Sequence, residues 1–540
     1  MRANEVVAKI LKLEGVEYLF CFPANDLIEA CAKVDIRPIM TRTERTLINM
    51  AHGYSLVSNG KRLGVGCVQG GPGSENAFAG VAHAFADSAP VLMLPGGISQ
   101  SERSIPPGFE SIRHYGGVTK WVAEVNMAER IPNMMHRAFH LLRSGQPGPV
   151  MLEIPSNVMS DDVDDDFEYK PPKPAKPAAN PDDVSAAVKA LLASENPLLH
   201  VGQGVLYAEA TDELVEFAEL LQLPVMTTMA GKSAFPENHP LSIGASGYKG
   251  LKRVAPFLDR ADLVFGLGSG FSTQVMCTNI PPGKILVQNS ISETDISKEY
   301  LIDYPILGDA KLVLRQLIDE VKRQGGGGVS NPELVQEIKA VKDKWLDKWM
   351  PKLSSDEVPI NPYRVIWDLM NTVDRTKTMV THDSGNPRDQ MMPFFQSIIP
   401  HGYIGWGKST QLGFGLGVIM GAKLAAPQNL AVNIMGDAAF GMAGMDFETA
   451  ARERIPILTI ILNNSALGNY KSYMPVSTER YGTPYLSGDY AKVAEGLGGY
   501  SERVEDPAEI IPAINRAQQE MEAEKPALLE IITREEGEFS

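Results

Sequence analysis

Cysteines are scarce in this sequence, and long apolar runs are absent. Only four cysteines occur in 540 residues, at Cys21, Cys31, Cys67 and Cys277, too few and too scattered for a disulfide framework or a zinc site. No run of 18 apolar residues occurs, so no segment is predicted to span a membrane. The N-terminal segment has the apolar spacing of an amphipathic helix and lacks the continuous apolar core of a signal peptide. We therefore expect a cytoplasmic protein.

Basic residues are also in short supply. Lys and Arg total 50 against 66 Asp and Glu, a net charge of −16, and no Lys/Arg cluster is able to neutralise a track of phosphates, which argues against a nucleic-acid partner. Hydrophobic residues make up 44% of the chain, enough for several globular cores. The 49 glycines gather in a few clusters, and such clusters often mark places where the backbone approaches a ligand.

Two segments have the composition of linkers and divide the chain into three parts. Residues 161–183 combine an acidic run with a proline-rich stretch, and residues 323–333 contain four consecutive glycines. The predicted domains are therefore 1–160, 184–322 and 355–540. Each alternates short apolar runs with helical patterns, as in 63–70, 74–86 and 90–97. This alternation predicts three doubly wound α/β domains with parallel sheets, in which ligands bind at the carboxyl ends of strands.

One segment matches the phosphate-binding loop of nucleotide hydrolases. Residues 402–409 fit G-x-x-x-x-G-K-[ST], from Gly402 to Lys408 and Ser409, and an apolar run ending in Asp437 follows. Its context is unfavourable, because a phosphate-binding loop leaves a buried strand and Pro400 stands two residues before the motif. The glycines between 413 and 421 suit close helix packing better than catalysis. A nucleotide hydrolase remains the alternative hypothesis.

The same Asp437 supports a second hypothesis. Gly436-Asp437-Ala438 ends one predicted strand, and 24 residues later Asn463-Asn464 ends another. Adjacent parallel strands would place a carboxylate and a carboxamide at one sheet edge. Mg²⁺ prefers such oxygen ligands and commonly bridges protein to phosphate groups. The helix after Gly436 would present N–H groups to a diphosphate.

This spacing resembles the binding motif of thiamine-diphosphate (ThDP) enzymes. Further matches follow the acetohydroxyacid synthase and pyruvate decarboxylase superfamily from end to end: residues 41–44 followed by 49–55, Gly71-Pro72-Gly73 with Asn76, and residues 411–416. The resemblance implies a pyrimidine-binding domain, a central domain and a diphosphate-binding domain, in that order.

The resemblance also implies roles for individual residues. Glu44 would hydrogen-bond the aminopyrimidine N1′ of the cofactor and act in catalysis, and Asn25 would lie near its reactive C2 carbon. Leu412 would bend the cofactor. Asp437, Asn464 and the Ala466 carbonyl would bind Mg²⁺. The residues expected to contact the cofactor are Glu44, Gly73, Ser384, Gly385, Asn386, Thr410, Leu412, Gly436, Asp437, Ala438, Ala439, Asn464, Ala466 and Leu467.

The substrate half departs from the synthase pattern. Pro23-Ala24-Asn25 stands where synthases have Pro-Gly-Gly, the glutamine expected after Phe109 has no counterpart, and Tyr473 replaces a tryptophan. We therefore expect a carbon–carbon lyase or ligase acting on 2-keto acids or related carbonyl compounds, by decarboxylation or by acetolactate synthase-like carboligation. A ThDP-dependent carbon–carbon hydrolase or aldehyde lyase stays open.

Four histidines and a flavin complete the expectations. His83, His114 and His382 are candidate proton relays, because an imidazole titrates near neutral pH, although a structural role is favoured for each; His52 is expected at the surface. Synthases hold FAD on the central domain, but residues 286–295 lack the usual acidic residue at the strand end and the glycine-rich residues 266–273 are a weak signal. We expect no FAD or a vestigial site.

The resemblance also predicts the assembly. Family members pair the glutamate of one subunit with the diphosphate-binding domain of another. We therefore expect a homodimer or homotetramer with active sites between subunits.

Overall fold

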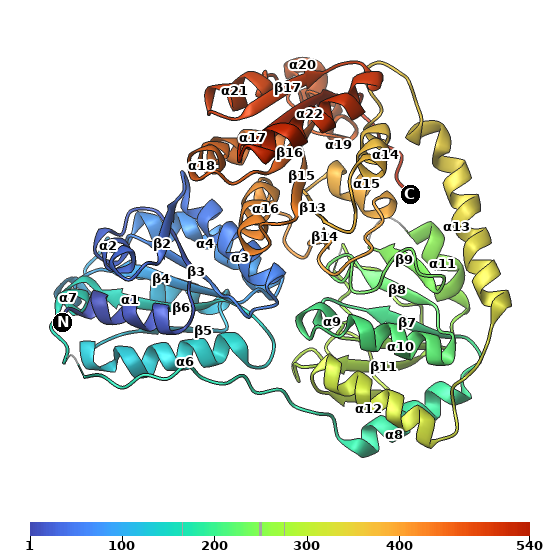
Figure 1. The fold of residues 1–540 in the computed structure, drawn as a ribbon, viewed down its shortest axis with the longest axis horizontal. Helices are drawn as coiled ribbons and strands as arrows, with labels where there is room; N and C mark the ends of the chain where they lie inside the picture. Colours follow the sequence, from blue (N-terminus) through green and yellow to red (C-terminus); the bar gives the residue numbers. More distant parts are fainter. Residues whose placement is uncertain (165, 248–250, 275) are drawn as a thin grey trace.

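Three six-stranded parallel sheets make up the framework of the chain. The structure is a computed structural model that describes residues 1–164, 166–247, 251–274 and 276–540; the side chains of Asn25 and Leu251 lie outside the description. In Figure 1 the N-terminal part (blue), the central part (green to yellow) and the C-terminal part (orange to red) occupy three corners of the molecule. The prediction of three α/β units with parallel sheets is confirmed.

The strands of each sheet come from one continuous part of the chain. The first sheet has the order β2-β1-β3-β4-β6-β5, the central sheet β12-β11-β10-β7-β8-β9 and the third β14-β13-β15-β16-β18-β17. Their bounds are β1 Tyr18–Cys21, β2 Arg37–Met40, β3 Gly64–Val68, β4 Val91–Gly97, β5 Trp121–Glu124, β6 Val150–Pro155, β7 Pro197–Val201, β8 Val225–Thr228, β9 Ser242–Ser246, β10 Leu263–Leu267, β11 Ile285–Ser290, β12 Tyr304–Leu307, β13 Thr378–His382, β14 Tyr403–Ile404, β15 Leu430–Gly436, β16 Leu458–Asn463, β17 Tyr500–Val504 and β18 Ala527–Ile532.

Helices connect the parallel strands and cover the sheets. The first sheet is accompanied by α1 (Ala3–Leu13), α2 (Asn25–Lys33), α3 (Glu44–Val57), α4 (Pro72–Ala86) and α6 (Ile131–Arg143). The central sheet is accompanied by α8 (Pro181–Ala193), α10 (Thr211–Leu221), α11 (Leu251–Arg260) and α12 (Ala310–Arg323). The third is accompanied by α14 (Pro362–Thr372), α15 (Asn386–Phe394), α16 (Phe414–Ala425), α17 (Asp437–Ala443), α18 (Phe447–Glu453) and α22 (Ile510–Glu522).

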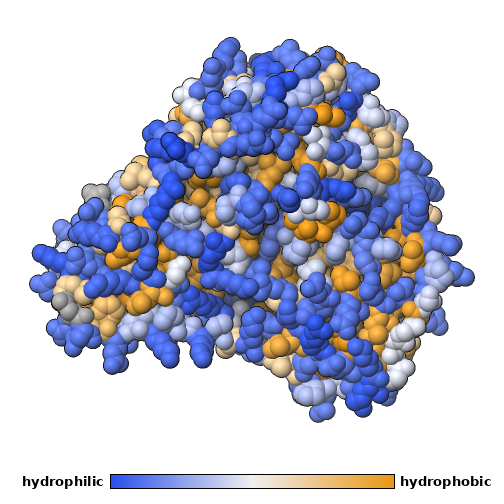
Figure 2. All heavy atoms as spheres, in the orientation of Figure 1, coloured by the Kyte–Doolittle hydropathy of each residue, from blue (hydrophilic) through white to orange (hydrophobic). Residues whose placement is uncertain are grey.

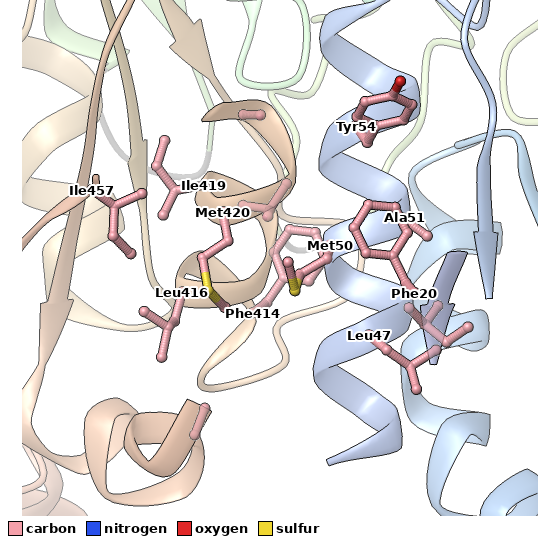
Figure 3. Close-up of a cluster of buried hydrophobic side chains, with 14 of the residues drawn as sticks. Phe20, Leu47, Met50, Ala51, Tyr54, Phe414, Leu416, Ile419, Met420 and Ile457 are labelled. Atoms are coloured by element: carbon pink, nitrogen blue, oxygen red, sulfur yellow. The ribbon is translucent and has the colours of Figure 1, made fainter. Parts of the chain in front are cut away.

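The first and third sheets share one topology. Numbered within its own sheet, each has the order 2-1-3-4-6-5, so α3 and α16 each follow the second strand of their sheet and precede the third. These equivalent helices pack against each other, and Figure 3 shows their side chains in one buried cluster that includes Leu47, Met50, Phe414 and Met420. The core is therefore continuous between the N-terminal and C-terminal parts.

Glycines allow α3 and α16 to approach closely. A Cβ at Gly417 would lie 2.5 Å from the Cβ of Asn49, and a Cβ at Gly53 or Gly421 would overlap a backbone carbonyl of the opposite helix. Since any side chain would force the helices apart, the prediction of close helix packing is confirmed for Gly417 and Gly421.

The two predicted linkers differ in structure. Apart from the undescribed residue 165, the chain between Asp161 and Asn180 contains no helix or strand, whereas the glycine-rich stretch leads directly into α13 (Pro332–Leu353). Helix α13 runs along one side of the molecule from the central to the C-terminal part (Figure 1) and packs against α14. The sequence interpretation had assigned no element to residues 334–354.

The surface is mainly hydrophilic in the view of Figure 2, with apolar residues scattered among charged ones. Within the described ranges, no helix is both long and apolar enough to cross a bilayer.

Candidate active site

A cavity of about 230 Å³ lies at the carboxyl ends of strands in the third sheet. Segments that follow β13, β15, β16 and β18 line it, because the carboxyl ends of parallel strands meet at one sheet edge. Twelve of the fourteen residues expected to contact the cofactor are found here: Ser384, Gly385, Asn386, Thr410, Leu412, Gly436, Asp437, Ala438, Ala439, Asn464, Ala466 and Leu467. The structure therefore brings together four segments that are separated in the sequence.

Asp437 offers an unpaired oxygen to this cavity. Its side chain is 3% exposed; Oδ1 accepts the N–H of Ala438 at 2.8 Å, while Oδ2 is buried without a hydrogen-bond partner. Burial is the main cause that raises the pKa of this carboxyl above its usual value. A buried, unpaired carboxylate oxygen is costly unless a cation or donor compensates it, so this oxygen fits a divalent cation.

The two asparagines at the end of β16 have different surroundings. Asn463 donates its Nδ2 to Glu530 Oε1 at 2.7 Å inside the sheet, whereas Asn464 lines the cavity. The Asn464 Oδ1 accepts the N–H of Ala466 at 3.0 Å, which closes a turn that brings Ala466 to the cavity as well. Carboxylate, carboxamide and backbone carbonyl oxygens form the kind of hard donor set that suits Mg²⁺.

Sequence reasoning missed eight other residues of the cavity wall. They are Pro362, Pro387, Gln390, Leu462, Gly468, Tyr470, Thr533 and Arg534. Thr533 and Arg534 directly follow β18, and the apolar run 527–532 before them is the signal in the sequence that could have placed them at this sheet edge.

The N-terminal residues of the predicted site lie elsewhere in the chain. Glu44 is the first residue of α3, is 6% exposed and accepts a hydrogen bond from Asn76 Nδ2 at 3.3 Å. Gly73 lies in the first turn of α4. In the described part of the chain, all residues that line the 230 Å³ cavity come from 362–534, so the structure does not bring Glu44 or Gly73 to it. The predicted position of Asn25 concerns a side chain outside the described structure.

Three of the four histidines singled out in the sequence are buried away from the cavity. His83 stacks on Phe414 with 3.7 Å between ring centroids, and His382 stacks on Trp406 at 4.7 Å. The surface position expected for His52 is wrong: it is 2% exposed, because α4 and α16 pack over α3 at this point. Burial lowers the pKa of His52 and of His382 to about 3, so both are neutral at physiological pH.

His114 is the exposed exception. Its ring stacks on Phe109 at 4.5 Å, and its Nδ1 lies 2.8 Å from the Glu110 carbonyl oxygen.

The match to a phosphate-binding loop does not have that conformation. Strand β14 lies inside the motif at Tyr403–Ile404 rather than before it. No helix begins at Ser409, and the next helix is α16, which starts at Phe414. The structure therefore contradicts the phosphate-binding-loop hypothesis for residues 402–409.

Three family models match the chain in the order of its three sheets. The N-terminal TPP binding domain of thiamine pyrophosphate enzymes matches residues 1–123, their central domain matches 184–317, and their C-terminal TPP binding domain matches 383–531. The chain belongs to the thiamine pyrophosphate enzymes. The last match contains most of the residues of the cavity wall.

Relatives with assigned names are similar over nearly the whole chain. The probable acetolactate synthase large subunit of Methanocaldococcus jannaschii is 30% identical, with 98% of this chain and 92% of that protein covered. The acetolactate synthase large subunit of Corynebacterium glutamicum is 30% identical over 100% of this chain and 88% of that protein. The isozyme 3 large subunit of Escherichia coli is 27% identical over 95% and 91%.

A second cavity, of about 600 Å³, lies against the central sheet. Gly268, Gly270 and Asn289 are among its lining residues. Asn289 is the penultimate residue of β11, within the stretch that lacks the acidic residue expected of a flavin-binding synthase. Its Nδ2 donates to the carbonyls of Ile306 and Gly308 at 3.2 and 3.1 Å, and its Oδ1 accepts the Gly268 N–H at 3.2 Å. The side-chain amide of Asn289 is therefore hydrogen-bonded to backbone groups of the central sheet region. The absence of FAD stays a prediction.

Proposed function

We propose that this thiamine pyrophosphate enzyme uses Mg²⁺ together with ThDP and makes or breaks a carbon–carbon bond next to a carbonyl in 2-keto acids or related compounds. The observation that carries the proposal is the 230 Å³ cavity, in which the unpaired Oδ2 of Asp437 shares one wall with Asn464 and Ala466. Similarity to acetolactate synthase large subunits over nearly the full chain supports the substrate class.

Different residues of the cavity would contact the metal ion, the diphosphate and the bend of the cofactor. Asp437, Asn464 and the Ala466 carbonyl would hold Mg²⁺, which neutralises the diphosphate. Backbone N–H groups of Ala438 and Ala439 and the loop from Ser384 to Asn386 would contact the diphosphate itself. Leu412, which packs against the core cluster shared with α3, would support the bent cofactor.

Glu44 is proposed as the proton-handling group of the reaction. When bound, ThDP supplies an acidic carbon that adds to the substrate carbonyl and an electron sink for the bond that breaks. Glu44 would hydrogen-bond the aminopyrimidine ring and control the proton there. Its burial and its hydrogen bond from Asn76 keep the carboxylate in one position. Gly73, in the helix that carries Asn76, would leave room for the ring.

We also propose at least a homodimer. The cavity contains residues of 362–534 alone in the described structure, whereas Glu44 belongs to the N-terminal sheet. A second copy would bring its own Glu44 to the cavity and complete the site.

Substrate screening tests the proposed activity. Purified enzyme with ThDP and Mg²⁺ is given pyruvate, longer 2-keto acids, acyloins and aldehydes, and CO₂ release and products are measured. Turnover of at least one 2-keto acid is expected, with no turnover by an Asp437→Ala control. Turnover of acyloins or aldehydes without turnover of any 2-keto acid would contradict the proposed substrate class. Turnover unchanged by Asp437→Ala would reject the proposed site.

A further inference from the structure

A buried carboxylate joins the two loops that border the cofactor cavity. Asp383 follows β13, and its side chain is 0% exposed. Its Oδ1 accepts the N–H of Ser384 at 2.8 Å and that of Gly413 at 2.9 Å, and its Oδ2 accepts the N–H of Gly415 at 2.9 Å. Backbone N–H groups from two segments thirty residues apart therefore meet on one side chain.

Asp383 caps a helix that has no cap of its own. Gly413 is the N-cap of α16, has a φ of 86° and carries no side-chain oxygen to accept the first N–H groups of the helix. The carboxylate from the neighbouring strand takes that place, and its negative charge is favourable at a helix N-terminus. The first turn of α16 is thereby tied to β13.

The carboxylate is retained at an energetic cost. Burial raises the pKa of Asp383 to about 6, which shows that its charged form is disfavoured despite three hydrogen bonds. None of the ion pairs of the described residues involves Asp383, and the three backbone donors are the largest influences that lower its pKa, ahead of His83. Burying an ion without a counter-ion is disfavoured, and such groups concentrate where geometry has to be precise.

Both anchored loops lead directly into the cavity wall. Ser384, whose N–H is bound, lines the cavity, and so does Leu412, which immediately precedes the bound Gly413. Ser384 belongs to the loop proposed to cover the diphosphate, and Leu412 to the turn proposed to support the bend of the cofactor. Asp383 does not line the cavity itself.

We infer that Asp383 is a positioning residue that fixes the Ser384 loop and the Leu412 turn relative to each other before ThDP binds. The inference rests on the proposed ThDP site but adds a residue that does not touch the cofactor. Without the carboxylate, the two walls would move independently, and ThDP would have to order them on binding.

The test compares two Asp→Asn variants in the same domain. In Asp383→Asn the amide oxygen can keep part of the acceptor set, but the NH₂ group faces a backbone N–H, so at least one hydrogen bond is lost. The control is Asp368→Asn in α14, which also removes a buried carboxylate: Asp368 is 6% exposed and pairs with Arg364 at 2.8 Å, but it does not line the cavity.

Three measurements on the full-length protein follow: the ThDP dissociation constant with Mg²⁺, the apo melting temperature and the hydrogen exchange of backbone amides. We expect Asp383→Asn to weaken ThDP binding by about 10–100-fold, as substitutions behind a ligand shell do. The half-saturating ThDP concentration should rise more than kcat at saturating ThDP falls. Amides of Ser384, Gly413 and Gly415 should lose protection, and Asp368→Asn should bind ThDP like wild type whatever its melting temperature.

Two outcomes overturn the inference. One is wild-type ThDP affinity in Asp383→Asn; the other is an equal loss of affinity in both variants, which would indicate general destabilisation. If Asp383→Asn does not fold, hydrogen exchange of the wild-type protein without ThDP tests the inference instead. The backbone amides of Ser384, Gly413 and Gly415 must then be protected, and exchange as fast as in open loops rejects the inference. Failure of wild type to bind ThDP would reject the proposed function instead.

Discussion

Gly421 of α16 lies directly against the carbonyl oxygen of Met50 in α3, so that a Cβ at Gly421 would overlap that oxygen. The Met50 oxygen is a backbone atom and cannot move aside as the end of a flexible side chain could. The contact joins the N-terminal and C-terminal parts of one continuous core. We expect Gly421→Ala to destabilise the fold by about 1–3 kcal/mol, the range for overpacking a core. Chemical denaturation measures this.

Gly496→Ala is the matched control. Gly496 ends helix α21 (Tyr490–Gly496), and a Cβ there would meet nothing within 4 Å. Alanine should leave stability unchanged or raise it by up to about 1 kcal/mol. Equal effects of the two substitutions would mean that α3 and α16 do not pack as described.

Glu44→Ala should abolish turnover. If Glu44 controls a proton in catalysis, its loss should reduce kcat by at least about 10²-fold, in the range of general acid–base contributions, while ThDP binding stays measurable. Glu75→Gln, which changes a carboxylate in the first turn of α4, is the control and should keep wild-type turnover. Rates and ThDP affinity are measured on the same preparations. A fully active Glu44→Ala enzyme would remove Glu44 from the mechanism.

Stability should fall as pH falls below about 6.5. Burial lowers the pKa of His52 and His382 to about 3, and of His200 and His401 to about 4. Below pH 6.5 these histidines are protonated in the unfolded chain, whereas in the folded chain they stay neutral until a much lower pH. Each histidine therefore lowers the free energy of unfolding by up to about 1.4 kcal/mol per pH unit. Buried carboxyls with raised pKa values, Asp383 and Asp437 among them, oppose this, because the folded state takes up their protons at a higher pH than the unfolded chain does. The pKa shifts of His52 and His382 are larger than that of Asp383, so the histidines are expected to dominate.

Urea unfolding at pH 7.5 and 5.5 checks this dependence. The free energy of unfolding should be lower at pH 5.5. His401→Asn should reduce the difference. Greater stability at pH 5.5 would contradict the buried neutral histidines.

The purified enzyme is expected to lack flavin. Asn289 lies within the stretch that lacks the acidic residue expected of a flavin-binding synthase and is held by Gly268, Ile306 and Gly308. The visible absorbance spectrum before and after denaturation measures any FAD. A stoichiometric flavin band, or activity that requires added FAD, would show that the 600 Å³ cavity holds this cofactor.

The sequence predicted the parts of the fold whose pattern is local. The apolar runs that became β3 and β16 are buried throughout, and those that became β4 and β15 are buried except at their ends. Fully buried parallel strands are continuous apolar segments in the sequence. The diphosphate side of the site was predictable because short motifs mark the strand ends. Asp437 and Asn464 directly follow the neighbouring strands β15 and β16, as their spacing suggested.

What escaped prediction depends on contacts between distant segments. His52 is buried because α16, more than 350 residues later, covers it. Arg534 lines the cavity because β18 pairs with β16. Asp383 was outside the motifs, and its role depends on the N–H groups of Gly413 and Gly415, which no local pattern places beside it.

Thermal unfolding with added cofactor tests the central claim most directly. The chelator-treated enzyme is mixed with ThDP, ThDP and Mg²⁺, or ATP and Mg²⁺, and the melting temperature is recorded for wild type and Asp437→Ala. ThDP with Mg²⁺ should stabilise wild type, by about 2.7 kcal/mol at a concentration one hundred times the dissociation constant. The shift should vanish with chelator and in Asp437→Ala, and ATP should have no effect. Stabilisation by ATP and none by ThDP with Mg²⁺ would contradict the account.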